Sequence, residues 1–148
     1  MQKVWEIANL YLATLREIYI IHQNNHWKTK GVGFYGDHLL FQRLYESAIT
    51  NADLAAEKFI GLFGENGVDF DTQCLLMHKI GQKYSDLQDS PYEMSLQIEK
   101  DFLELSQQVY DKFDAEHVMS LGLDDMLMEI ASKREEATYL LQQSLGKE

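Results

Sequence analysis

Apolar residues recur every three or four positions along most of the chain, which is the spacing of an α-helix with one buried face. The pattern predicts one helix over residues 3–28 and a second, continuous helix over residues 34–63, with Gly64 at the position of a C-terminal cap. The apolar stripe of the first helix is wider than one neighbouring helix requires. We therefore expect this helix to be covered on two sides, by its own bundle and by another subunit.

The segment after Gly64 is too long for a simple loop between two helices of a bundle. Asp71 or Thr72 can cap a short helix that ends at Ile80. Ser90 then gives a strong helix start, because a serine N-cap is followed by proline at the first helical position and by a capping-box glutamate.

The third long helix is expected to begin at Pro91 and to end before residues 121–122, and the fourth to span about residues 124–145. Four long helices with one long crossover between the second and third predict an all-α, ferritin-like four-helix bundle, with a short extra helix in the crossover. We expect a single domain over residues 1–148, which is long enough to bury a sizeable core.

The charge of the chain narrows the choice of partners. The formal net charge of −11 disfavours nonspecific binding to nucleic acid and favours attraction of cations. The sequence contains no long uncharged apolar stretch and no secretory leader, so we expect a cytoplasmic protein without a membrane segment. Cys74 is the only cysteine and cannot form an internal disulfide, which is consistent with a reducing cytoplasm.

Candidate metal ligands lie around the turn between the first two helices and along the second helix. His26 and His38 flank the turn, and because the helices are antiparallel the two side chains can face each other. Asp53 and Glu57 lie one helical turn apart further along the second helix. His38 and Asp53 face broadly the same way but are roughly 22 Å apart along the helix axis, so no single metal ion can bridge them within one chain.

A second copy of this helix, lying antiparallel beside the first, closes the gap. A two-fold axis near residues 46–48 brings His38 of one chain opposite Asp53 and Glu57 of its partner, and it does so twice. Small residues around the axis allow the two backbones to approach closely. The site is therefore predicted to be shared between subunits.

A ferritin-type di-iron centre inside the bundle would require a Glu-x-x-His motif on each of two helices. No histidine of this chain follows a glutamate by three positions. An intrachain centre of this type is therefore not expected.

The same stretch resembles the signature of the Dps family, the twelve-subunit mini-ferritins. The matching residues are His26, Trp27, Gly31, Phe34, His38, Phe41, Tyr45, Asp53 and Glu57. The resemblance implies a hollow spherical dodecamer that oxidises Fe(II), often with hydrogen peroxide, and stores the ferric product inside. It also implies that His26, His38, Asp53 and Glu57 form the catalytic iron site. Whether zinc competes with iron there is left open by the sequence.

One position departs from the family pattern. The family usually has an aspartate four residues after its second histidine, where this chain has Gln42. A glutamine offers a neutral carbonyl oxygen, whereas hard cations favour carboxylates, so one iron can bind well while a second binds weakly. The site can thus be mononuclear or dinuclear. Glu46, one turn further on, can replace the missing ligand, although it is expected to face the dimer seam or solvent.

A second acidic cluster lies at the start of the fourth helix. Asp125 and Glu129, with Asp124 and the preceding Glu116, are favourably placed for the helix dipole. The resemblance implies in addition that Asp125 and Glu129 line a three-fold pore through which iron enters, since rings of carboxylates select cations. Both interpretations can hold together.

The remaining histidines are interpreted as hydrogen-bonded packing residues. These are His22, His78 and His117. His22 lies one turn before His26 and can alternatively join a metal cluster. Trp27 is interpreted as a core residue, although in the family that the chain resembles a tryptophan there lies beside the iron site.

Three classes of function remain open from the sequence. The first is a ferroxidase and iron store that protects against peroxide, and the second is a storage or structural cage whose oxidation site is degenerate because of Gln42. The third is nucleoid compaction, which some Dps proteins perform with lysine-rich tails. Only Met1 and Gln2 precede the first helix, and Gly-Lys-Glu follows Leu145. With the negative net charge, we expect no DNA binding at physiological salt.

Overall fold

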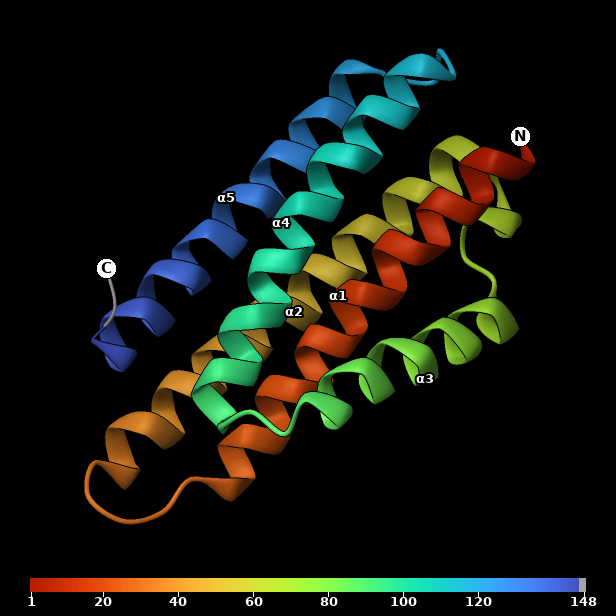
Figure 1. Cartoon of the computed structure of the whole chain (residues 1–148). Helices are drawn as coiled ribbons and strands as arrows, with labels where there is room; N and C mark the ends of the chain where they lie inside the picture. Colours follow the sequence, from red (N-terminus) through yellow and green to blue (C-terminus); the bar gives the residue numbers. More distant parts are fainter. Residues whose placement is uncertain (147–148) are drawn as a thin grey trace.

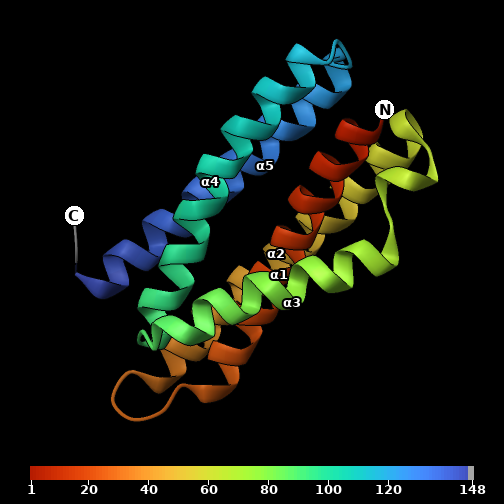
Figure 2. The same ribbon diagram turned by 45° about the vertical axis from the view of Figure 1, so that its right-hand side comes forward.

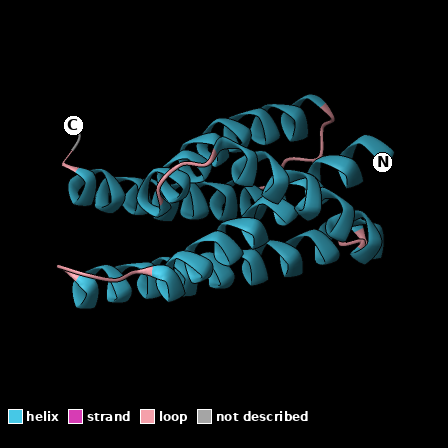
Figure 3. Ribbon diagram, turned by 60° about the horizontal axis from the view of Figure 1, so that its bottom comes forward, coloured by secondary structure: helices cyan, strands magenta, loops and turns pink. Residues whose placement is uncertain are grey.

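The computed structural model describes residues 1–146, and Lys147 and Glu148 of the short C-terminal tail lie outside the described residues. The elements in chain order are α1 (Gln2–Lys28), α2 (Phe34–Phe63), the 3₁₀ turn η1 (Glu65–Gly67), α3 (Phe70–Leu87), α4 (Pro91–Ala115) and α5 (Leu121–Leu145). Over residues 1–146 all regular structure is helical (Figure 3). The predicted all-α bundle with an extra helix in the crossover is therefore confirmed.

The long helices form two antiparallel pairs. α1 packs against α2, and α4 packs against α5, while α1 also contacts α4 and α2 contacts α5 (Figure 1). α3 packs on α1, on the side away from α5 (Figures 1 and 2). The wide apolar stripe of α1 is thus covered on its second side by α3 of the same chain, where the sequence had suggested another subunit.

The crossover helix is longer than predicted at both ends. Asp69, not Asp71 or Thr72, is its N-cap, and the Asp69 carboxylate accepts the backbone N–H of Thr72 at 2.9 Å. The helix continues past Ile80 because Tyr84, one turn later, is buried in the core. It ends only at Leu87, because the next residue, Gln88, adopts left-handed backbone angles.

The last two helices begin at serine caps. The Ser90 hydroxyl accepts the N–H of Glu93 at 3.2 Å, which confirms the predicted start of α4. Ser120 accepts the N–H of Leu123 at 3.1 Å, so α5 begins at Leu121, three residues earlier than predicted. None of the helices within residues 1–146 is long and apolar enough to cross a membrane.

A polar cluster lies fully buried in the middle of the bundle. Arg134 of α5 forms an ion pair with Glu99 of α4, with Nη1 and Oε2 3.3 Å apart, and both side chains have no exposed surface. Arg134 also donates through Nη2 to the Ser47 hydroxyl of α2 at 2.9 Å. His22 of α1 contacts Glu99 Oε2 at 3.0 Å, so the cluster joins all four long helices, α1, α2, α4 and α5.

Burial favours the neutral form of His22, and the tautomer of that form follows from its partners. Burial lowers the pKa of His22, and the Glu99 carboxylate can only accept, so the ring proton lies on Nε2. Nδ1 then accepts from the Ser95 hydroxyl at 2.9 Å, and that hydroxyl accepts in turn from the Asn25 amide at 2.7 Å. The packing interpretation of His22 is confirmed. For His78 and His117 it is wrong, since both side chains are exposed.

Candidate functional site

The two predicted histidine ligands lie together at the end of the α1–α2 hairpin. Gly31 and Gly33 adopt positive φ angles of 86° and 82°, which turns the chain sharply between the helices. The rings of His26 and His38 stack with centroids 3.7 Å apart and an interplanar angle of 18°. His26 is buried and His38 is half-buried, so the pair lies at the edge of the core.

Each histidine is held by the backbone of the other. His26 Nδ1 lies 2.7 Å from the carbonyl oxygen of His38, and His38 Nδ1 lies 2.9 Å from the carbonyl oxygen of His26. A carbonyl oxygen can only accept, so both Nδ1 atoms carry the proton. In the neutral form each ring therefore keeps its lone pair on Nε2. Metal-binding histidines usually have this arrangement, in which the second nitrogen donates to a fixed acceptor.

Aromatic side chains fix the positions of the two rings further. Phe34 stacks on His38 with a centroid distance of 5.0 Å, and Tyr45 meets His26 edge-on at 5.3 Å. Trp27, which directly follows His26 in the sequence, is 66% exposed. Its core interpretation is therefore wrong for the isolated chain, in which the indole is exposed.

The two predicted carboxylate ligands lie at the other end of the same helix. Asp53 and Glu57 are both exposed on α2. They lie roughly 22 Å or more along the helix from His38, as the rise per residue requires. No group of three or more His, Cys, Asp or Glu side chains within residues 1–146 of one chain is placed to hold a metal ion. The four predicted ligands therefore form two separate pairs.

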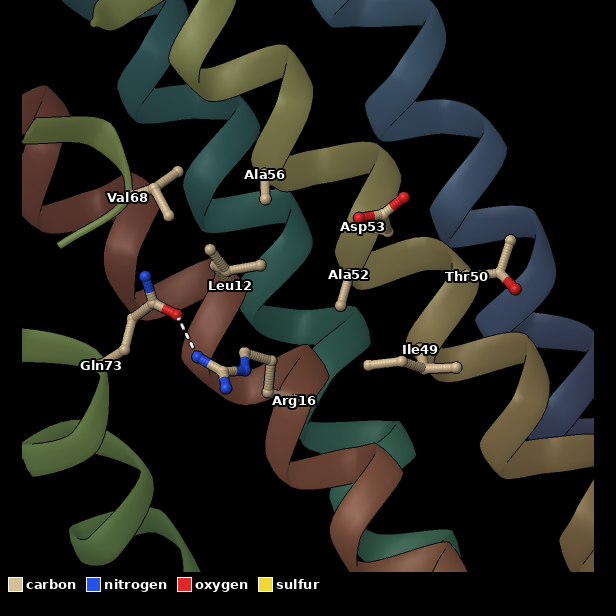
Figure 4. Close-up of a pocket in the computed structure, with 9 residues that line it drawn as sticks. All are labelled: Leu12, Arg16, Ile49, Thr50, Ala52, Asp53, Ala56, Val68 and Gln73. Carbon is tan, nitrogen blue, oxygen red and sulfur yellow. Dashed lines mark hydrogen bonds between the residues drawn. The ribbon is translucent and has the colours of Figure 1, made fainter. Parts of the chain in front are cut away.

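Asp53 borders a groove of about 460 Å³ between α1, α2 and the start of the crossover (Figure 4). Its floor is apolar, with Leu12, Ala52 and Ala56 among the lining residues. Arg16 also lines the groove, and its guanidinium Nη1 donates to Gln73 Oε1 at 2.7 Å. The groove thus presents one carboxylate and one guanidinium above a small-residue surface.

Gln42 follows His38 by one turn and is bound to its own helix. Its amide Nε2 donates to Glu46 Oε1 at 3.0 Å, and Glu46 is exposed, as expected from the sequence. The amide nitrogen is thereby occupied, and the carbonyl oxygen of Gln42 stays available as a neutral ligand.

The predicted pore residues lie on one short stretch of surface. Asp125 and Glu129 are both exposed in the first turns of α5, and Glu116 is exposed just after α4. Asp124 is half-buried beside Tyr110, whose pKa the nearby Asp124 carboxylate raises. A pore requires other subunits, so this assignment remains a prediction.

The sequence analysis did not identify the buried pair Arg134 and Glu99 or the groove residue Arg16. Arg134 and Glu99 occupy inward-facing positions in otherwise apolar helix faces. A charged residue at such a position could have indicated a buried ion pair. The two residues fill the middle of the bundle, where a ferritin-type centre would have its ligands. Arg16 gave no such signal, because its place beside Asp53 depends on how α1 and α2 pack.

Comparison with known proteins finds similarity over nearly the whole chain. No family model matches the sequence. The chain is 25% identical over 146 residues to general stress protein 20U of Bacillus subtilis, covering 98% of this chain and 99% of that protein.

Solved structures show the same fold at lower sequence identity. Dps from Thermosynechococcus elongatus superposes with a TM-score of 0.79 at 16% identity, covering 99% of this chain and 92% of that one. Dps from Microbacterium arborescens, solved in its high iron form, gives a TM-score of 0.75 at 18% identity, covering 97% of this chain and 93% of that one. The resemblance noted in the sequence is thus confirmed at the level of the fold.

Proposed function

Because the chain has the fold of the Dps proteins, we propose that it is a cytoplasmic mini-ferritin that oxidises Fe(II) and stores the ferric product inside a dodecameric cage. The observation that carries the proposal is the histidine pair, whose Nδ1 atoms are tied to backbone carbonyls while both Nε2 atoms stay free. Fe(II) is the substrate, and hydrogen peroxide is the proposed oxidant. Removing both reactants together would protect the cell from oxidative damage.

The iron site in this proposal is completed by pairing two chains. In an antiparallel α2–α2 dimer, His26 and His38 of one protomer approach the partner's Asp53 and the partner's Glu57. Exposed apolar residues on the same face of α2, such as Ile49 and Ile60 at 40% and 47% exposure, support the burial of this face by another copy. Two neutral imidazoles and two carboxylates give a net charge that favours Fe(III) over Fe(II) and so favours oxidation.

Gln42 supports a second version of the proposal. The Gln42 amide is neutral, and its nitrogen donates to Glu46, so residue 42 itself supplies no negative charge for a second iron. The site would then bind one iron well, or the protein would serve mainly as a storage cage. Nucleoid compaction is the least supported function, because the net charge is −11.

Anaerobic titration of the assembled protein with Fe(II), followed by peroxide, tests the proposal. We expect saturable binding and rapid oxidation, read as ferric absorbance, and loss of both in His38→Ala and in Asp53→Ala. Asp71→Ala, which removes an exposed carboxylate from α3, is the matched control and should behave as the parent. Parent-like oxidation in both site variants would refute the assignment. A gel shift with DNA at low micromolar protein would revive the compaction function.

Mixing the two inactive variants tests whether the site is shared. In a mixed dimer of His38→Ala and Asp53→Ala chains, one of the two sites regains both intact residues, so random pairing should restore about a quarter of the parent sites. Sites contained within one chain would give no restoration.

A further inference from the structure

The positively charged guanidinium of Arg16 lines the groove beside Asp53, and hydrogen bonds to buried residues fix its position. Arg16 Nη1 donates to Gln73 Oε1 at 2.7 Å, and Gln73 is only 2% exposed. The Gln73 amide donates to Asn9 Oδ1 at 3.4 Å, and Asn9 is itself anchored to the backbone oxygens of Trp5 and Asn66. This chain of hydrogen bonds holds the guanidinium at the wall of the groove, and Figure 4 shows its outermost bond, from Arg16 to Gln73.

Arg16 and Asp53 share the groove without neutralising each other. Both side chains line it, yet within residues 1–146 no ion pair of 4.0 Å or less joins them. In Figure 4 the guanidinium is turned toward Gln73 and away from Asp53. Opposite charges that face one cavity but are held apart leave room for a third species between them.

We propose that Arg16 binds the peroxide oxidant beside Fe(II) held at Asp53, and that Gln73 is the positioning residue that keeps Arg16 from occupying Asp53 itself. The inference rests on the proposed iron oxidation and adds a residue to it. A guanidinium is permanently charged and presents paired N–H donors, so it binds an oxygen species that gains negative charge.

The reaction balances with two Fe(II) ions for each peroxide. Each Fe(II) loses one electron, the O–O bond breaks, and the two oxygen atoms leave as hydroxide or, after taking up two protons, as water. Arg16 donates hydrogen bonds to the departing oxygen while its own proton count stays constant. An unrestrained Arg16 would instead pair with Asp53 and compete with Fe(II), which is the reason for the Gln73 contact.

The two residues therefore have separable effects in the assembled protein. Arg16→Met should raise the KM for hydrogen peroxide by about tenfold or more, the loss expected for a hydrogen bond to a charged group, while Fe(II) affinity is unchanged or tighter. Gln73→Met should weaken anaerobic Fe(II) binding several-fold. The double variant should recover the Fe(II) affinity, because no guanidinium remains to compete.

Controls separate this role from a structural one. Arg43→Met, which removes an exposed arginine of α2 outside the groove, should keep the parent KM. Arg16→Lys keeps the charge but not the paired donors, so it should assemble normally, by light scattering, and still show a raised KM. A parent-like KM in Arg16→Met, with Asp53-dependent Fe(II) binding intact, overturns the role of Arg16 alone. Absence of Asp53-dependent Fe(II) binding in the parent overturns the proposed function and this inference with it.

Discussion

Arg134→Met should strongly destabilise the protein, because it leaves the Glu99 carboxylate charged and buried. The two groups are 3.3 Å apart with no exposed side-chain surface. At an effective dielectric constant of about 20, their direct attraction is roughly 5 kcal/mol. Removing one partner of such a buried pair typically costs about 3–5 kcal/mol. We expect a loss of this size, which is a large part of the stability of a domain.

Urea unfolding followed by far-UV circular dichroism, at a fixed protomer concentration, measures this loss. Arg43→Met is the matched control, because Arg43 of α2 pairs with Glu136 of α5 at the surface, with side chains 62% and 42% exposed. An exposed pair contributes about 0–1 kcal/mol. Both pairs consist of an arginine and a glutamate, so the comparison tests the effect of burial on the strength of the pair.

The double variant Arg134→Met/Glu99→Gln completes the test. It removes both charges and should recover much of the stability that either single variant loses. A cost below about 1 kcal/mol for Arg134→Met would refute the reasoning. So would a double variant whose loss equals the sum of the two single losses, because the groups would then be independent.

Three further predictions concern other parts of the chain. Burial raises the pKa of Glu17 to about 7, so the folded state keeps a proton that the unfolded chain releases near pH 4.5, and stability should fall as pH rises through this window. Glu17→Gln should remove this loss of stability, which is at most about 3 kcal/mol, whereas exposed Glu6→Gln should retain it. If the parent and Glu17→Gln have identical urea midpoints at both pH 5 and pH 8, the expected direction of the pH dependence is contradicted. Gln42→Asp should tighten the weaker iron, and an unchanged second binding constant in calorimetry would count against the account of that position. Ser90→Ala should cost about 1 kcal/mol in urea unfolding through loss of the α4 cap, and no change would mean that proline alone fixes the helix start.

The helices were predictable because their start and stop signals are local. The bounds of α2 were obtained in full, since Gly64 closes an uninterrupted apolar pattern. The bounds of the crossover helix α3 were harder to predict from the sequence. Its cap, Asp69, precedes the residues that looked like caps, and Gly81 did not end the helix. An added Cβ at Gly81 would lie 2.8 Å from Glu17 Oε1, so this glycine makes room for a packed carboxyl group.

The site was predictable only in part. Sequence spacing indicated that His26 and His38 can face each other, and the stacked rings agree with that expectation. The reciprocal bonds to backbone carbonyls could not be foreseen, since they depend on the twist of the glycine turn. Contacts between α1 and α2 likewise decide that Arg16 and Asp53 share a groove. Ligand pairing across subunits stays a prediction, because it involves a second chain.

The crossed hydrogen bonds of the α1–α2 turn have a consequence for how a metal ion is captured. Since each imidazole is already fixed by the opposite backbone, an arriving ion does not have to immobilise either ring, and the entropic cost of binding has been met when the hairpin forms. The same arrangement makes the rings interdependent. Truncating one ring removes the hydrogen bond that it donates to the opposite backbone and also the ring against which the other imidazole stacks, so the turn acts as a single chelating unit.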